Sequence, residues 1–140
     1  MDLLNEKLVA PCGLYCGECL GFQEGKCGGC VSREGLCLKY SKVCSIYECC
    51  AEKRKHRFCS ECRDFPCRKI DRFFNTPEWN VQVVANLKQI SETGIKRFLN
   101  SEAKRVTKLI NCAKKRGIKH CSRCKNWPCE KLGRPALVPE

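Results

Sequence analysis

The stretch CSECRDFPCRKI, residues 59–70, decides how this chain is organised, because it returns as CSRCKNWPCEKL at residues 121–132. With one cysteine upstream, each copy carries four thiols separated by nine, three and five residues. Four thiolates are the ligand set of a closed structural zinc site. The repeat therefore predicts two equivalent metal sites. Their ligands are Cys50, Cys59, Cys62 and Cys67 in the first copy and Cys112, Cys121, Cys124 and Cys129 in the second.

An aromatic residue and a proline precede the last cysteine of each copy, at Phe65-Pro66 and Trp127-Pro128. A residue before proline avoids the helical region, so we expect an extended backbone there. Neither histidine, His56 or His120, has a counterpart in the other copy, and we assign neither as a ligand or as a catalytic group. A duplicated hairpin without metal is the alternative interpretation, and the identical spacing of every thiol argues against it.

The eight cysteines outside the repeat are enough for two more tetrads. One partition groups Cys16, Cys19, Cys27 and Cys30, as zinc ribbons do, and leaves Cys12, Cys37, Cys44 and Cys49 together. The other groups Cys27, Cys30, Cys37 and Cys44 and leaves Cys12, Cys16, Cys19 and Cys49. The sequence does not choose between the two partitions, and Cys49 and Cys50 could exchange roles between neighbouring sites.

The density of thiols, 16 in 140 residues, indicates either a disulfide framework or a set of metal sites. The N-terminus shows no basic start followed by an apolar stretch, and no apolar run approaches a membrane span, so we expect a cytoplasmic protein with reduced thiols. Four CxxC pairs then favour metal. We predict zinc, about four ions per chain. An iron–sulfur cluster or a dithiol redox carrier is the alternative, although no spacing matches the compact ferredoxin run.

Between the two copies the pattern is helical. Thr76 is a good N-cap, Pro77 suits the first helical position, and Gly94 can end the helix. Apolar residues recur at helical spacing on both sides of Gly94. They are Trp79, Val83, Val84, Leu87 and Ile90, then Ile95, Phe98, Leu99, Val106, Leu109 and Ile110.

We therefore expect a small metal-stapled α-rich domain, with irregular cysteine-knuckle lobes and little regular sheet, joined by a helical hairpin. The predicted organisation has three parts. They are an N-terminal cysteine-rich metal-binding lobe at residues 1–70, the hairpin at 71–111, and the C-terminal cysteine repeat at 112–140, which packs on the same domain.

The formal net charge is +12, a value that ordinarily suggests nucleic acid. Sixteen thiolates around four Zn²⁺ would add sixteen negative and eight positive charges and lower it to about +4. Basic clusters at residues 53–57 and 114–119 lie within the nine-residue step of each copy, so we interpret much of the excess as compensation for the metal sites. A zinc-dependent nucleic-acid-binding module is kept as an alternative, without a stacking strip or recognition-helix signature to support it.

The motifs PCGLYCGEC at 11–19, CGGC at 27–30, CSIYECC at 44–50 and CSECRDFPC at 59–67 resemble a family of small prokaryotic cysteine-rich proteins known as a domain of unknown function. The resemblance covers about residues 8 to 100 and departs at the C-terminus, where this chain carries a fuller repeat. It implies a prokaryotic source and zinc binding, and it brings no activity, substrate or partner.

Complete tetrads leave no open coordination position, which catalytic zinc needs, so we expect no enzyme activity and no catalytic residue. The function that the sequence favours is a non-enzymatic interaction or regulatory module, with an unknown protein partner and no membrane association.

Overall fold

The computed structural model describes residues 2–37, 42–127 and 129–130; Pro128 and residues 131–140 of the predicted C-terminal segment lie outside the described residues. The described elements are η1 (Glu6–Leu8), η2 (Cys16–Glu18), α1 (Leu20–Gln23), α2 (Ser45–Tyr47), η3 (Glu48–Lys53), η4 (Cys59–Glu61), α3 (Arg68–Phe73), α4 (Pro77–Thr93), α5 (Ile95–Lys115) and η5 (Cys121–Arg123). In this part of the chain, strand pairing is limited to one bridge between Val9 and Tyr15. The predicted α-rich class with little sheet is confirmed.

The helix α4 begins and ends where the sequence predicts, whereas α5 continues to Lys115, past the predicted end of the hairpin at residue 111. Thr76 has an extended backbone before Pro77, which opens α4, although the threonine side chain makes no capping hydrogen bond. Gly94 ends α4 with a φ of +90°, a conformation that glycine adopts without a steric penalty. Ile95 then opens α5 directly. Cys112 lies inside this helix, so the C-terminal repeat continues from α5 without a linker.

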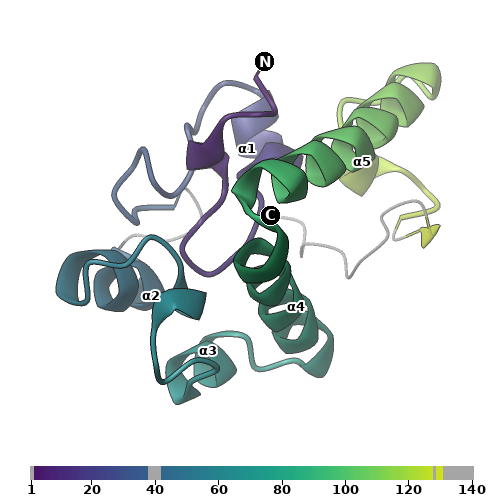
Figure 1. Ribbon diagram of the computed structural model, residues 1–140. Helices are drawn as coiled ribbons and strands as arrows, with labels where there is room; N and C mark the ends of the chain where they lie inside the picture. Colours follow the sequence, from purple (N-terminus) through teal and green to yellow (C-terminus); the bar gives the residue numbers. More distant parts are fainter. Residues whose placement is uncertain (1, 38–41, 128, 131–140) are drawn as a thin grey trace.

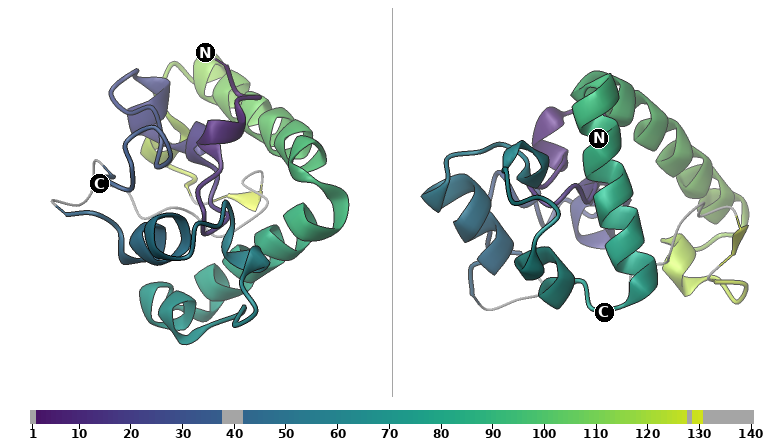
Figure 2. Two further views of the ribbon diagram at one scale, coloured as in Figure 1. Left: turned by 60° about the vertical axis from the view of Figure 1, so that its left-hand side comes forward. Right: turned by 60° about the horizontal axis from the view of Figure 1, so that its bottom comes forward.

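The helices α4 and α5 form an open V whose arms meet at Gly94, a looser arrangement than a side-by-side hairpin (Figures 1 and 2). The N-terminal cysteine segment contacts both arms. The short helices η1 and η2 lie against α5, while η4 lies against α4. No helix in the described residues has both the length and the apolar character that crossing a membrane requires.

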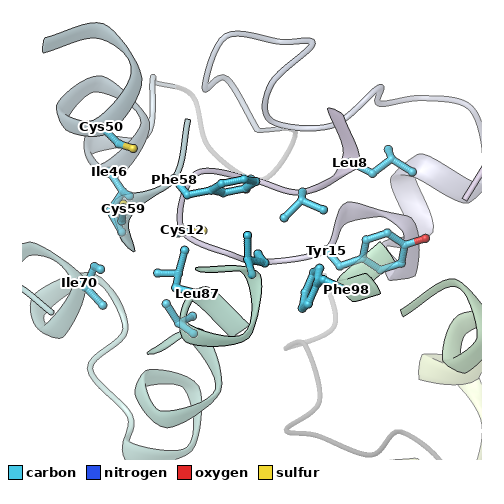
Figure 3. Close-up of a cluster of buried hydrophobic side chains, with 14 of the residues drawn as sticks. Leu8, Cys12, Tyr15, Ile46, Cys50, Phe58, Cys59, Ile70, Leu87 and Phe98 are labelled. Atoms are coloured by element: carbon cyan, nitrogen blue, oxygen red, sulfur yellow. The ribbon is translucent and has the colours of Figure 1, made fainter. Parts of the chain in front are cut away.

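The core lies where these segments meet (Figure 3). Val83 and Leu87 from α4 and Phe98 and Val106 from α5 are at most 1 % exposed, which confirms the predicted apolar face of each helix as core. The N-terminal segment supplies the opposite side of this core. Its buried apolar members include Leu8, Val9, Tyr15 and Phe58. Three cysteines, Cys12, Cys50 and Cys59, belong to the same cluster, so thiols are part of the core itself.

A buried polar contact fixes the loop that carries Cys12 to α4. The amide Nδ2 of Asn86, a residue only 3 % exposed, donates a hydrogen bond to the Gly13 carbonyl at 3.0 Å. Gln82 Nε2 donates to Asn86 Oδ1 at 2.7 Å, so both ends of the buried amide are satisfied. The cysteine loop is thereby tied to a helix about seventy residues further along the chain.

Gly17, between Cys16 and Cys19, packs against the ring of Tyr15. A Cβ at position 17 would clash with Cζ and the hydroxyl of Tyr15, and that ring is held by a hydrogen bond from its hydroxyl to the Leu3 carbonyl at 2.6 Å. We expect Gly17→Ala to lower the free energy of unfolding by about 1–3 kcal/mol, the usual cost of overpacking, as measured by urea titration.

Gly28→Ala is the matched control for this substitution. Its nearest neighbour would be the Ser32 side chain at 3.3 Å, which can move aside. If the two alanine variants are equally stable, the close contact between Gly17 and Tyr15 is not a constraint on the fold.

Candidate metal centres

The four cysteines of the C-terminal copy line a single pocket of about 210 Å³. Cys112 comes from the last turns of α5, Cys121 and Cys124 flank η5, and Cys129 follows the second aromatic–proline step. Arg116 lines the same pocket. The structure therefore brings together the four residues that the repeat groups, from segments separated by up to 17 positions in the chain.

The two copies share one backbone conformation around CxxC. In the first copy Cys62 N–H donates to the Cys59 carbonyl at 3.1 Å, and Phe65 N–H donates to the Cys62 carbonyl at 3.1 Å. The equivalent bonds of the second copy, from Cys124 and Trp127, are both 3.0 Å long. Each CxxC forms a single 3₁₀ turn that ends in an extended residue.

The same turn occurs a third time, at Cys16–Cys19. Cys19 N–H donates to the Cys16 carbonyl at 3.0 Å, and Cys19 is extended, with φ −70° and ψ 134°.

Two cysteine sulfurs, those of Cys27 and Cys124, accept hydrogen bonds from backbone N–H groups. The Gly29 N–H donates to Cys27 Sγ at 3.4 Å. Asn126 N–H donates to Cys124 Sγ at 3.5 Å in the same way. Hydrogen bonds from outer groups of this kind orient the ligands of metal sites.

The first copy is buried more deeply than the second. Cys50 and Cys59 are 3 % and 8 % exposed. Their thiols are hydrogen-bonded to each other, which lowers the pKa of Cys50 and raises that of Cys59. Cys67 is partly buried and close enough to interact electrostatically with Cys59. The peptide bond between Phe65 and Pro66, which precedes Cys67, is cis.

Cys62 faces an arginine. Arg54 Nη1 donates to Cys62 Sγ at 2.7 Å and pairs with Asp64 Oδ2 at 3.0 Å. Arg116 holds the equivalent position in the second copy; a hydrogen bond with Cys112, followed by the nearness of Cys124, raises its pKa. Each copy therefore places one arginine beside its thiols. The shared four-residue step from Cys50 to Arg54 and from Cys112 to Arg116 is the sequence signal that could have identified this pair.

Thiols from both groups of each predicted partition lie close to one another in the N-terminal segment. Cys30 interacts electrostatically with Cys16, Cys44, Cys37 and Cys27, a set that mixes members of both groupings. Cys12 interacts with Cys30, Cys44 and Cys16, and also with Cys59 of the first copy. Cys49 lies instead on the side of Arg54, so Cys50 is the member of the adjacent pair that faces Cys59.

Burial controls the charge of these thiols. It raises the pKa of Cys16 to about 11 and that of Cys30 to about 12, with neighbouring cysteines adding to the effect, and it also raises the pKa of Cys12. Without a metal these thiols are protonated near neutral pH. A metal ion would have to displace their protons, which couples its binding to proton release.

The described cysteine side chains of the C-terminal copy line a pocket without being arranged in the geometry of metal ligands. Among the described residues, no group of three or more His, Cys, Asp or Glu side chains is arranged to hold a metal ion. The C-terminal pocket nevertheless suits zinc in its donor set, because four soft sulfur ligands line it and a cation stands beside them. Loading it would require the sulfurs to move toward one another.

A buried ion pair links the N-terminal CxxC to α5. The carboxylate of Glu18, between Cys16 and Cys19, accepts hydrogen bonds from Arg105 at 3.0 and 3.1 Å. Arg105 also pairs with Glu102 at 2.8 Å. All three side chains are at most 17 % exposed. Sequence reasoning missed this contact, because nothing near Glu18 in the chain points to residue 105.

His120 extends the link to the C-terminal copy. Its Nδ1 accepts from the Ser122 N–H at 3.2 Å, so the proton lies on Nε2, which donates to the Glu18 carbonyl at 2.8 Å. His120 thus contacts one CxxC turn while it caps the next. His120 therefore helps to position the two turns. The alignment of the two copies does not reveal this, because His120 has no counterpart in the first copy.

Fold and cysteine arrangement together define a small α-rich protein built on a duplicated cysteine unit. The family model described as a protein of unknown function (DUF3795) matches residues 8–72 and 80–134, and the chain belongs to that family. Each matched segment ends five residues after the last cysteine of a copy, Cys67 or Cys129, in agreement with the internal repeat. The expectation that the resemblance ends near residue 100 is wrong. No curated protein and no solved structure matches the chain.

Proposed function

We propose that this protein is a zinc-binding module in which four-cysteine sites, about four per chain, hold the cysteine segments in their folded form. The observation that carries the proposal is the pocket lined by Cys112, Cys121, Cys124 and Cys129. Four thiols are the ligand set of structural zinc, and Glu130 is the one carboxylate that lines the pocket with them. The repeat of the same spacing in the first copy supports a second site of the same kind.

The electrostatics of the two copies support a thiolate site as well. A zinc ion with four thiolates carries two net negative charges, which a neighbouring guanidinium stabilises. Arg54 and Arg116 stand at that position in each copy. A complete tetrad leaves no coordination position for a substrate, so the proposed role is structural, in a non-enzymatic interaction or regulatory module of the cytoplasm.

Elemental analysis of protein purified without added metal tests the proposal. We expect about four zinc per chain, and about one fewer in Cys121→Ser/Cys124→Ser, because that double variant removes half of one tetrad. Cys59→Ser/Cys62→Ser is the matched variant in the other copy, with the same expected loss. Iron with acid-labile sulfide and visible absorption would favour the iron–sulfur alternative. Metal-free protein with a full melting transition would contradict both.

A further inference from the structure

The positive charge of this chain is concentrated in its C-terminal third. Residues 103–129 contain nine Lys and Arg and no Asp or Glu. Two of the nine form ion pairs within the protein: Arg105 in the buried pair with Glu18, and Lys119 with Glu24 at 3.8 Å. A zinc tetrathiolate at the C-terminal copy would offset about two charges, so the metal does not neutralise this region. Most of these Lys and Arg side chains can therefore bind a negatively charged partner.

On α5, three of these cations form a line with Arg97, which lies earlier in the same helix. Arg97, Lys104, Lys108 and Lys115 are separated by seven, four and seven residues, which places them within about 40° of one another around a helix of 3.6 residues per turn. All four are exposed. At 1.5 Å per residue, the line extends over about 27 Å. Figure 1 shows α5 along the periphery of the molecule.

The line has no acidic partner among the residues that the structure describes. In the described part of the chain no ion pair involves any of these four side chains. The acid of α5, Glu102, is held by Arg105 on the flank of the helix. The opposite face of α5, with Phe98, Leu99 and Val106, is buried in the core, so the helix is fixed in place.

We propose that the outer face of α5 binds the phosphate backbone of a nucleic-acid duplex without regard to base sequence. A rigid row of cations suits a partner whose own charges are regularly spaced along a rod, as they are in a duplex. An anionic membrane is the other polyanion to consider. Basic helices bind membranes by inserting an apolar face, and the apolar face of α5 is already occupied by the core. The proposal rests on α5 and its exposed side chains and does not depend on the proposed zinc sites being filled by zinc.

Fluorescence anisotropy with labelled DNA and RNA duplexes of one sequence, over a range of salt concentrations, tests this surface. Four phosphate contacts predict a slope of about −4 for log K against log salt on DNA, equivalent to a loss of affinity of about a hundredfold between 50 and 200 mM salt. Lys104→Gln/Lys108→Gln is expected to reduce the slope by about two. Comparison of the two duplexes shows whether the backbone bound is that of DNA, RNA or both.

Lys69→Gln/Lys88→Gln is the matched control, because it removes the same charge from exposed positions on α3 and α4. It should leave the slope unchanged. The proposal is overturned by absence of binding to both duplexes at about 25 mM salt, the most permissive condition. It is equally overturned if the control variant weakens binding as much as the α5 variant, or if phosphatidylserine vesicles bind and duplexes do not. Metal analysis of the same samples separates these outcomes from failure of the zinc proposal.

Discussion

If the proposed zinc sites are filled, treating the protein with a chelator is expected to abolish its tertiary structure as a whole. The reason lies in what α4 and α5 pack against: Leu8, Tyr15 and Phe58 all belong to the cysteine-bearing segments. Structural zinc contributes about 10–16 kcal/mol of apparent binding free energy in zinc-finger peptides. A domain of this size has a net stability of only about 5–15 kcal/mol. Loss of even one site that orders the N-terminal segment therefore exceeds what the remaining contacts can replace.

Circular dichroism and thermal melting before and after chelation measure this effect. We expect the near-ultraviolet signal and the cooperative transition to disappear together, with much of the helical signal, since helices of 17 and 21 residues are marginal without a packing partner. Adding zinc in excess of the chelator should restore both signals. An unchanged melting transition in metal-free protein would mean that the apolar core alone holds the fold.

The long helices could be predicted from the sequence because their signals are local. Thr76, Pro77 and Gly94 mark the boundaries of α4, and an apolar residue every three or four positions marks its buried face. The short helices around the cysteines could not be predicted in this way. The π-helix η3, which carries Cys49 and Cys50, shows no recurring apolar pattern, and the buried thiol of Cys50 contacts Cys59 from a later segment.

In the candidate site too, the features with a local sequence signal could be predicted, and those that depend on distant contacts could not. Repetition of spacing is a local signal, and it groups Cys112, Cys121, Cys124 and Cys129 as the structure does. The N-terminal thiols carry no repeat, and Cys12 interacts with Cys16, Cys30 and Cys44 as well as with Cys59, so spacing alone could not divide them. Contacts between distant segments could not be predicted from the sequence either. Glu18, for example, pairs with Arg105, which lies 87 positions away in the chain.

We expect Arg105→Ala, which breaks the contact between Arg105 and Glu18, to lower the free energy of unfolding strongly. The substitution removes the bidentate partner of the Glu18 carboxylate, which is buried at 6 % exposure, and it also removes one partner of Glu102. Breaking a buried pair by deleting one member costs about 3–5 kcal/mol, because the remaining charge stays desolvated. We expect a loss of that size in the free energy of unfolding measured with urea.

Arg97→Ala is the matched control, since it makes the same change at an exposed position of the same helix and should cost less than about 0.5 kcal/mol. Glu18→Gln/Arg105→Met removes both charges and is expected to recover part of the loss, which a simple packing defect at residue 105 would not do. Because Glu18 lies between Cys16 and Cys19 and receives the His120 hydrogen bond, Arg105→Ala should also speed alkylation of those two thiols under native conditions. Equal stability of the Arg105 and Arg97 variants, with unchanged thiol reactivity, would show that the N-terminal CxxC turn is held in place by its own cysteines rather than by α5.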